Sequence, residues 1–253
     1  MNTQGNTVLI TGGATGIGLS LAEYFIDSGN DVLICGRREN KLQEAKSKFP
    51  QLHIRVCDVS REKERESLYS WVKDNFGNIN MLVNNAGIQK MIDFKNGTRD
   101  LSGGQNEIET NLVAPVHLSA LFIPLFMKQK DAAIINISSS LGFTPMPHIP
   151  LYCVSKAAIH AFSMVLREQL KDTSVRVFEI VAPLVDTDLD QGSREKRKVS
   201  FRGIPPSKLA RPILDAIAND EYEIVVGEAV RLVNEGKKHL ELMLQHHKIL
   251  SAP

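Results

Sequence analysis

The feature that most constrains the fold is a glycine-rich loop near the start of the 253-residue chain. Residues 7–10 (Thr-Val-Leu-Ile) have the β-branched bias of a buried strand, and residues 19–26 have the apolar spacing of an amphipathic helix. Between them, residues 11–18 read Thr-Gly-Gly-Ala-Thr-Gly-Ile-Gly. Glycines let the backbone approach a pyrophosphate closely, and the helix N-terminus supplies free N–H groups. The loop residues that we expect around a nucleotide are Thr11, Gly12, Thr15, Gly16, Ile17 and Gly18.

A second apolar run, at residues 31–36, completes a β-α-β unit. In such units an acidic residue at the end of this strand binds the ribose 2′-hydroxyl, whereas an arginine accommodates a 2′-phosphate. Here the strand ends in Gly36, and Arg37 and Arg38 follow. Their guanidinium groups can pair with a phosphate, so we expect NADP(H) in preference to NAD(H), which stays possible. The alternative is that both arginines are solvated charges at the start of the next helix.

A possible proton-transfer site lies in the second half of the chain. Tyr152 and Lys156 are four residues apart, and Ser139 lies thirteen residues before Tyr152. In a helix, positions i and i+4 share a face, so the ammonium would stand beside the phenol. A cation there favours phenolate and lowers the tyrosine pKa from its ordinary value of about 10. Such a phenol can act as general acid or base at a carbonyl or alcohol oxygen, although the same spacing is common in solvated helix pairs.

Strand and helix patterns alternate along the whole chain. Further strands are expected at 52–57, 79–83, 132–137, 175–181 and 222–226, and further helices at 41–48, 62–76, 105–127, 151–170 and 208–218. This order predicts the α/β class: a Rossmann-type doubly wound parallel sheet of about seven strands, with helices on both faces, in a single domain. Ligands of such sheets bind beyond the carboxyl ends of the strands. The residues expected to meet there are Thr11, Gly36, Asp58, Asn84, Ser139 and Thr187.

With these motifs in this order, the chain resembles the short-chain dehydrogenase/reductase family over nearly its whole length. Within it, the stretches 56–60 and 84–89 are similar to bacterial oxidoreductases of the DltE type. The resemblance implies an NAD(P)-binding domain spanning residues 1–253. The catalytic set that it implies is Asn111, Ser139, Tyr152 and Lys156. The further cofactor contacts that it implies are Asp58, Val59, Asn84, Ala86, Gly87, Tyr152, Lys156, Val185 and Thr187.

The family's reaction is hydride transfer between C4 of a nicotinamide and the carbon of a carbonyl or alcohol substrate. By resemblance, Tyr152 gives or takes the proton, Ser139 binds the substrate oxygen, and Lys156 also binds the nicotinamide ribose. Asn111 would hold a water that links Lys156 to solvent, or would simply kink its helix ahead of Pro115. A function of another class is that of a non-catalytic nicotinamide-nucleotide sensor or scaffold.

Three segments leave questions open. Residues 182–187 read Ala-Pro-Leu-Val-Asp-Thr where the family has Pro-Gly-x-Val-x-Thr, and proline fixes φ and removes an N–H, which can change the turn's contacts. Residues 188–206 have the composition of a mobile substrate loop, whose basic run is either solvated or attracts an acidic substrate. The C-terminal helical segment at 228–250 either packs on a partner or closes the site.

Composition argues against several classes of protein. The net charge of +1 gives no electrostatic case for nucleic acid or an anionic membrane, and the most apolar window, 118–127, is short and interrupted by Pro124. Three cysteines without metal or redox spacing indicate buried thiols in a reducing cytoplasm, and we expect no metal site. Apolar helix faces suggest a homodimer or homotetramer, although these faces can equally cover the sheet.

Overall fold

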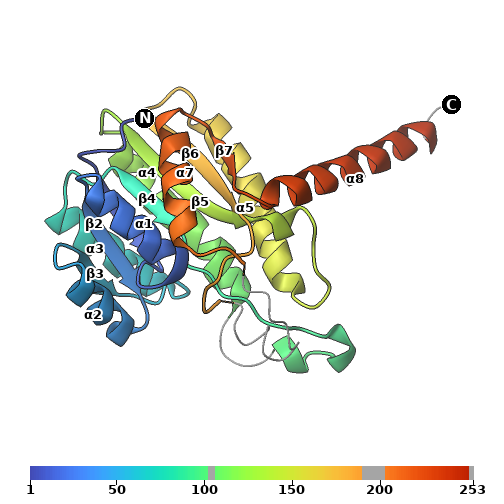
Figure 1. Ribbon diagram of the computed structural model, residues 1–253, viewed down its shortest axis with the longest axis horizontal. Coiled ribbons are helices and arrows are strands. Elements are labelled where there is room, and N and C mark those ends of the chain that lie inside the picture. Colours follow the sequence, from blue (N-terminus) through green and yellow to red (C-terminus); the bar gives the residue numbers. More distant parts are fainter. Residues whose placement is uncertain (102–105, 190–202, 251–253) are drawn as a thin grey trace.

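The computed structural model describes residues 1–101, 106–189 and 203–250, and for residues 240–250 it describes only the course of the helix. One seven-stranded sheet runs through the molecule in the order β3-β2-β1-β4-β5-β6-β7, and every neighbouring pair is parallel (Figure 1). The strands are β1 (Thr7–Thr11), β2 (Asp31–Gly36), β3 (His53–Val56), β4 (Met81–Asn84), β5 (Ala132–Ser139), β6 (Val175–Ala182) and β7 (Glu223–Val225). The predicted fold class is therefore confirmed.

Helices cover both faces of the sheet because the strand side chains alternate between two apolar cores. Val8 and Ile10 of β1 belong to one core and Leu9 to the other, as the two-residue period of a strand requires. The first core is covered by α1 (Gly16–Asp27), α2 (Glu39–Lys48) and α7 (Ser207–Ala218). The second is covered by α3 (Glu62–Asn75), α4 (Ala114–Phe126) and α5 (Pro150–Gln169). α1 and α7 lie side by side on their face (Figure 1).

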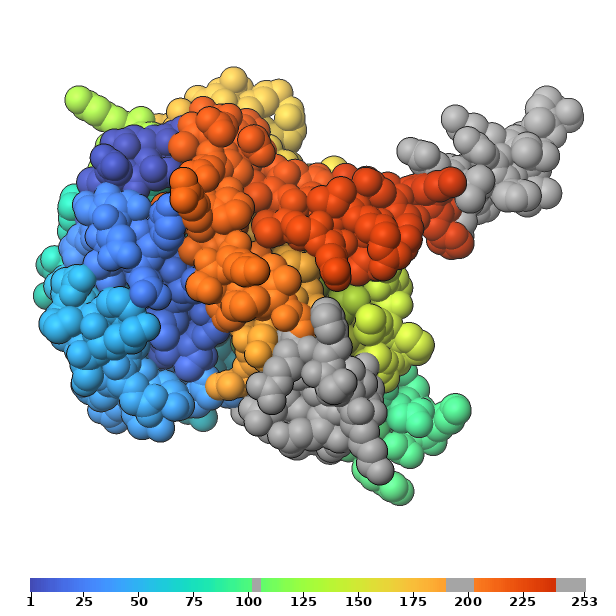
Figure 2. All heavy atoms as spheres, in the orientation of Figure 1, coloured from blue at the N-terminus to red at the C-terminus, as the bar shows by residue number. Residues whose placement is uncertain are grey.

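Shorter elements and a long C-terminal helix complete the described chain. The short ones are the 3₁₀ turns η1 (Phe94–Asn96), η2 (Arg99–Leu101) and η4 (Ser140–Gly142) and the π-helical turn η3 (Glu109–Val113). The last helix, α8 (Ala229–Leu250), begins on the body of the molecule and then projects away from it (Figure 1, Figure 2). Its first turns are anchored, because Ala229 and Val233 are buried against Val181 of β6.

Several strand and helix boundaries near the expected site differ from the predicted ones. β5 continues to Ser139 and β4 to Asn84, so both residues end their strands instead of following them. The helix expected over 105–127 divides into η3 and α4, and residue 105 lies outside the described residues. The N–H of Ala114 donates to the carbonyl of Glu109, a π-helical contact. Pro115 explains the change of register, since it has no N–H to offer the carbonyl of Asn111 as an α-helix requires.

Within the described residues, one helical stretch, Glu109–Phe126, is long and apolar enough to cross a membrane by length and composition alone. The π-helical turn extends the apolar window that the sequence suggested was too short. Leu118, Phe122 and Phe126 from this stretch are buried in the core between the sheet and α3 to α5. Packing inside the protein therefore accounts for its apolar character.

Candidate active site

A cleft of about 530 Å³ lies at the carboxyl ends of the parallel strands. Its walls come from the glycine loop after β1, the ends of β2, β5 and β6, the residues after β4, and one face of α5. This is the edge at which ligands bind in open parallel sheets. The predicted site residues that line the cleft are Gly12, Thr15, Gly16, Ile17, Arg37, Arg38, Asp58, Val59, Ala86, Gly87, Ser139, Tyr152, Lys156, Val185 and Thr187.

At its glycine positions, the loop passes too close to neighbouring atoms for a residue with a side chain. Gly12 and Gly16 have φ of +64° and +57°, in the left-handed region that favours glycine. A Cβ on Gly12 would lie 2.9 Å from the Cα of Ala86, and a Cβ on Gly16 would lie 2.9 Å from Cγ2 of Thr187. The loop therefore presents its backbone directly to the cleft, as close approach to a pyrophosphate requires, and we call it the glycine cradle.

Thr11 and Gly18, which were predicted in the site, lie behind the wall of the cleft and hold the loop in place. The Thr11 hydroxyl accepts hydrogen bonds from the backbone N–H groups of Asn85 and Ala86, both at 3.0 Å. The Asn85 side-chain amide donates to the carbonyls of Thr11 and Gly12, at 2.9 and 3.2 Å. It also packs where a Cβ on Gly18 would be, at 2.5 Å. Asn85 thus ties the end of β1 to the end of β4.

Asn85, in place of the predicted Asn84, lines the cleft. Asn84 was expected to contact the cofactor, but its side chain is buried and donates to Oδ1 of Asn136, at 2.8 Å, and to Ser119. Asn85 lines the cleft and was not among the predicted residues. The signal that could have found it is the period of two: Asn84 is the last residue of β4, so its side chain continues the alternation into the core.

Two arginines stand at the mouth of the cleft, after β2. Arg38 is half-exposed; it donates to the hydroxyl of Thr15, at 3.0 Å, and lies 3.5 Å from the carboxylate of Asp188. A Cβ on Gly36 would meet no atom within 4 Å, so there is open space beside these guanidinium groups. The contact with Thr15 places the Arg38 guanidinium beside the glycine cradle.

Asp58 and Val59 form another part of this wall. The Asp58 carboxylate accepts hydrogen bonds from the backbone N–H and the hydroxyl of Ser60, at 3.0 and 2.7 Å. Its own N–H donates to Glu64. These contacts fix the direction of the Asp58 side chain at the cleft edge.

The segment with the unusual Ala182-Pro183 pair also reaches the cleft. Val185 is buried and forms a parallel bridge with Ile204, and the N–H of Asp186 donates to the carbonyl of Ile204, at 2.9 Å. The two ends of the expected substrate loop, 188–206, are therefore held together. Its residues 190–202, and the mobility predicted for them, lie outside the described residues.

Tyr152 and Lys156 lie one turn apart on α5 and face the cleft together. The Lys156 ammonium is 5.6 Å from the centre of the Tyr152 ring and donates to the carbonyl of Ile137, at 2.7 Å. Both side chains are buried. Burial lowers the pKa of Lys156 from 10.5 to about 8, and the carboxylate of Glu179 opposes that change. Burial therefore brings the pKa of this amine to within reach of physiological pH, at about 8.

Ser139 ends β5 beside this pair. Its hydroxyl accepts from the N–H of Leu141, at 3.2 Å, which caps the 3₁₀ turn that follows. The neighbouring Ser138 is directed elsewhere, because its hydroxyl donates to the buried carboxylate of Glu179. This division supports Ser139 as the serine that faces a substrate.

Asn111 lies behind the cleft wall, within η3. Its side-chain oxygen accepts from the N–H of Ile88, at 2.9 Å, and its amide donates to the carbonyl of Ile88, at 2.8 Å. The amide also donates to the hydroxyl of Ser155 on α5, at 3.1 Å. Asn111 thereby connects the strand-end segment after β4 to the helix that carries Tyr152 and Lys156.

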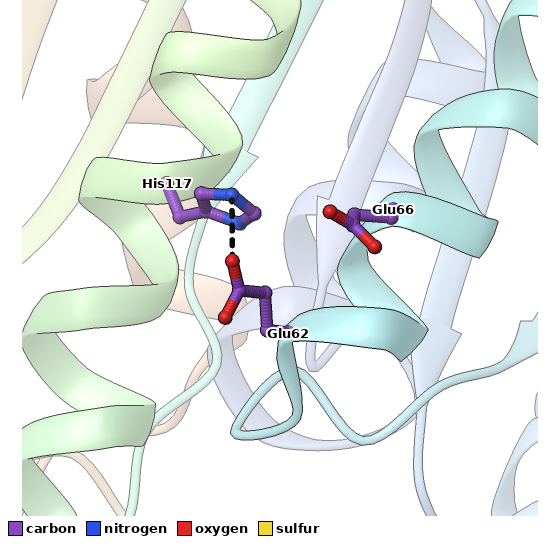
Figure 3. Close-up of side chains that lie close together, drawn as sticks. All are labelled: Glu62, Glu66 and His117. Atoms are coloured by element: carbon purple, nitrogen blue, oxygen red, sulfur yellow. Dashed lines mark ion pairs between the residues drawn. The ribbon is translucent and has the colours of Figure 1, made fainter.

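A cluster of potential metal ligands lies between α3 and α4, among residues that do not line the cleft. His117 Nε2 is 3.9 Å from Glu62, and Glu66 extends from the next turn of α3 (Figure 3). Arg65 Nε donates to His117 Nδ1, at 3.0 Å, so in the neutral ring the proton is on Nε2, facing Glu62. The Arg65 contact occupies Nδ1, and the proton on Nε2 leaves that nitrogen without the lone pair that a metal ligand needs.

Comparison with known proteins agrees with this geometry. A family model described as short chain dehydrogenase matches residues 6–198, and the chain belongs to that family of oxidoreductases. The chain is also 51% identical, over 224 residues, to the uncharacterized oxidoreductase DltE of Bacillus subtilis (strain 168). That match covers 88% of this chain and 89% of the relative.

Solved structures show the same fold. A short-chain dehydrogenase/reductase from Burkholderia phymatum in complex with NAD has a TM-score of 0.86 at 20% identity, covering 97% of this chain and 96% of that one. A short-chain dehydrogenase from Burkholderia cenocepacia J2315 in complex with NADP has a TM-score of 0.81 at 23% identity, covering the full length of both chains.

Proposed function

We propose that this protein is an NADP(H)-dependent oxidoreductase that interconverts a carbonyl and an alcohol, with Tyr152 as the general acid or base. The observation that carries this proposal is the placement of Tyr152, Lys156 and Ser139 around one end of a cleft whose other wall is a glycine cradle. Family membership supports oxidoreduction, and structures of the same fold hold NAD or NADP.

The residues present fit a dinucleotide. The glycine cradle offers close backbone approach for a pyrophosphate, and Thr187 lies against Gly16 of that cradle. Asp58 and Val185 line the same cleft, and the family likeness assigns Asp58 to the adenine and Val185 and Thr187 to the nicotinamide. A bound nicotinamide would supply the hydride chemistry, and the protein supplies position and electrostatics. Arg37 and Arg38, with the space beside Gly36, favour a 2′-phosphate over a 2′-hydroxyl.

In the reductive direction the substrate carbonyl oxygen gains negative charge and needs a proton. Tyr152 donates its hydroxyl proton to that oxygen, and Ser139 donates a hydrogen bond to it. The Lys156 ammonium stabilises the phenolate that Tyr152 becomes, because opposite charges lie close together in a buried setting. In oxidation the phenolate takes the proton from the alcohol.

Apolar residues border the end of the cleft around Tyr152, among them Leu141, Met146, Ile149 and Leu232. They favour a substrate with an apolar part next to its carbonyl or alcohol. Association into a homodimer or homotetramer stays a prediction. It rests on the exposed apolar side chains Val116 of α4, Met127 just after α4, and Val154, Met164 and Val165 of α5. Sedimentation of the purified protein tests it.

A panel of aldehydes, ketones and alcohols tests the proposed function. The purified protein should oxidise NADPH in the presence of at least one apolar aldehyde or ketone, with loss of the cofactor's absorbance and formation of the alcohol. A protein that binds NADPH tightly yet turns over no member of a broad panel would instead be a nucleotide sensor or scaffold.

A further inference from the structure

A carboxylate is buried in the sheet next to the proposed proton-transfer site. Glu179 lies in the middle of β6 and is fully buried. Its two oxygens have separate partners: the hydroxyl of Ser138 on β5 donates to Oε1, and Nδ1 of His160 on α5 lies 2.8 Å from Oε2. Both partners can act as donors, and a pair of donors suits an ionised carboxylate, which only accepts. Burying such a charge costs free energy unless hydrogen bonds or opposite charges compensate for the lost hydration.

The partners of Glu179 adjoin the residues that hold Lys156. Tyr152, Lys156 and His160 follow one another at intervals of four on α5, so they form one stripe facing the sheet. Lys156 donates to the carbonyl of Ile137, and the next residue, Ser138, binds Glu179. The ammonium and the carboxylate therefore occupy the same layer between α5 and the sheet, linked through two adjacent residues of β5.

The other charges around Glu179 lie on its far side, toward solvent. Glu223 of β7 and Lys237 of α8 form an ion pair at 2.8 Å, and the ligand atoms of His160, Glu179 and Glu223 all lie within 4.8 Å of one another. Glu179 and, to a lesser extent, Glu223 raise the pKa of His160, whereas burial and Lys237 lower it. Close to Lys156, the other described groups are the Tyr152 phenol and neutral atoms of Gly87 and Ile137.

We propose that Glu179 is a positioning residue for the reaction: its buried negative charge keeps the Lys156 amine protonated beside Tyr152. This inference rests on the proposed function. Burial alone disfavours the ammonium form, and Glu179 is the charge that opposes it. Ser138 and His160 hold the carboxylate in place, so the counter-charge is fixed rather than supplied by a flexible side chain.

The direction of the effect on pH dependence follows from the charges. Lys156 has a pKa lowered to about 8, so the ammonium is lost as the pH rises through that region. Reduction needs the ammonium, so its rate should fall on the alkaline side. Without the charge of Glu179, the pKa of Lys156 falls further, and the alkaline fall in rate begins at a lower pH.

The test compares pH profiles of kcat/KM for carbonyl reduction in three proteins. Glu179→Gln keeps the shape of the side chain and removes its charge, and it should move the alkaline limb down by about one pH unit. Glu179→Asp keeps the charge and should return the limb toward its wild-type position. Glu223→Gln removes a charge that lies beyond Glu179 and serves as the matched control. Its alkaline limb should move by at most about a few tenths of a pH unit.

An unmoved limb in Glu179→Gln, with the protein folded, would overturn the inference, and so would equal shifts in the Gln and Asp variants. If the Gln variant does not fold, the wild-type protein still decides: after labelling of lysine side chains with ¹³C, the Lys156 signal should show an ammonium at pH 7 that is lost as the pH rises through about 8. A neutral Lys156 amine at pH 7 would refute the counter-charge. The NMR titration requires no turnover, so its outcome is separate from the proposed enzymatic activity.

Discussion

At the scale of single residues, Arg38 already has partners from its own chain. Its guanidinium contacts Thr15 and Asp188, so a phosphate bound there has to share or replace the Asp188 contact. An exposed ion pair of this kind is worth about 0–1 kcal/mol. Hydrogen bonds to a charged group contribute about 1.5–3 kcal/mol. On these magnitudes a phosphate contact outweighs the Asp188 contact, so Asp188 is no obstacle to the proposed binding of NADP(H).

Replacing Arg38 tests the proposal that this arginine favours NADP(H) over NAD(H). Arg38→Gln should weaken NADPH binding about 10-fold or more, because a charge-assisted contact with the 2′-phosphate is lost, while NADH binding changes little. Fluorescence titrations with both cofactors measure this. Lys41→Gln is the matched control, since it removes a positive charge from α2 at a residue that does not line the cleft. Equal losses for both cofactors, or a wild-type preference for NADH, would show that the arginines have another role.

The residue identities of the site could be predicted better than their orientations. The glycine loop, Tyr152, Lys156 and Ser139 were all placed at the cleft by spacing and strand order, and the structure brings them together. Asn84 shows where such reasoning fails, because one position along a strand turns a side chain from the cleft into the core. Glu179 could not be found at all, since a lone acidic residue within an apolar strand gives no indication of its partners.

At the scale of elements, α8 has a role that its sequence left open. Its first turns close one side of the cleft: Leu232 lines it, and Gly236 lies against the backbone of Phe143, just after η4. A Cβ on Gly236 would be 2.5 Å from the carbonyl oxygen of Phe143. Phe143 in turn packs on His160, with ring centres 4.6 Å apart. The start of α8 is thus coupled to the turn that follows Ser139.

Substitution of Gly236 tests this coupling. Helix propensity alone favours alanine over glycine by about 1 kcal/mol. We nevertheless expect Gly236→Ala to destabilise the protein by about 1–3 kcal/mol, because the added methyl overpacks the contact with Phe143. KM for the carbonyl substrate should rise as Leu232 moves. Chemical denaturation and steady-state kinetics measure both effects, with the exposed Gly77→Ala as control, where a Cβ meets nothing within 4 Å. A stabilised variant with unchanged KM would mean that α8 does not shape the cleft.

The register change in the helix around Asn111 was also beyond the sequence prediction. Apolar periodicity indicates one continuous helix over 105–127, and the alternative role for Asn111 is only to kink that helix ahead of Pro115. The structure shows a π-helical turn there, which directs the Asn111 side chain onto Ile88 and Ser155. Periodicity reports which face is buried, but it does not report a single inserted residue within a helix.

At the scale of the whole molecule, the alternation of elements predicted the parallel sheet and the edge at which a ligand binds. The order in which the strands lie, with β1 and β4 adjacent at the centre, came only from the structure. That adjacency explains the cleft, because it lets Thr11 and Asn85 join the two strand ends beneath the glycine loop. Most of the buried apolar side chains of the described residues belong to two cores, one on each face of the sheet.

The central claim is that Tyr152 transfers the proton while a dinucleotide occupies the cleft beside it. The most direct measurement is the rate of a single turnover in protein preloaded with NADPH, for wild type and Tyr152→Phe, together with the NADPH affinity of each. We predict a loss of about 10³-fold in rate, with affinity unchanged within experimental error because the phenyl ring keeps its packing in α5. A Tyr152→Phe variant that reduces the carbonyl within tenfold of the wild-type rate would contradict the account.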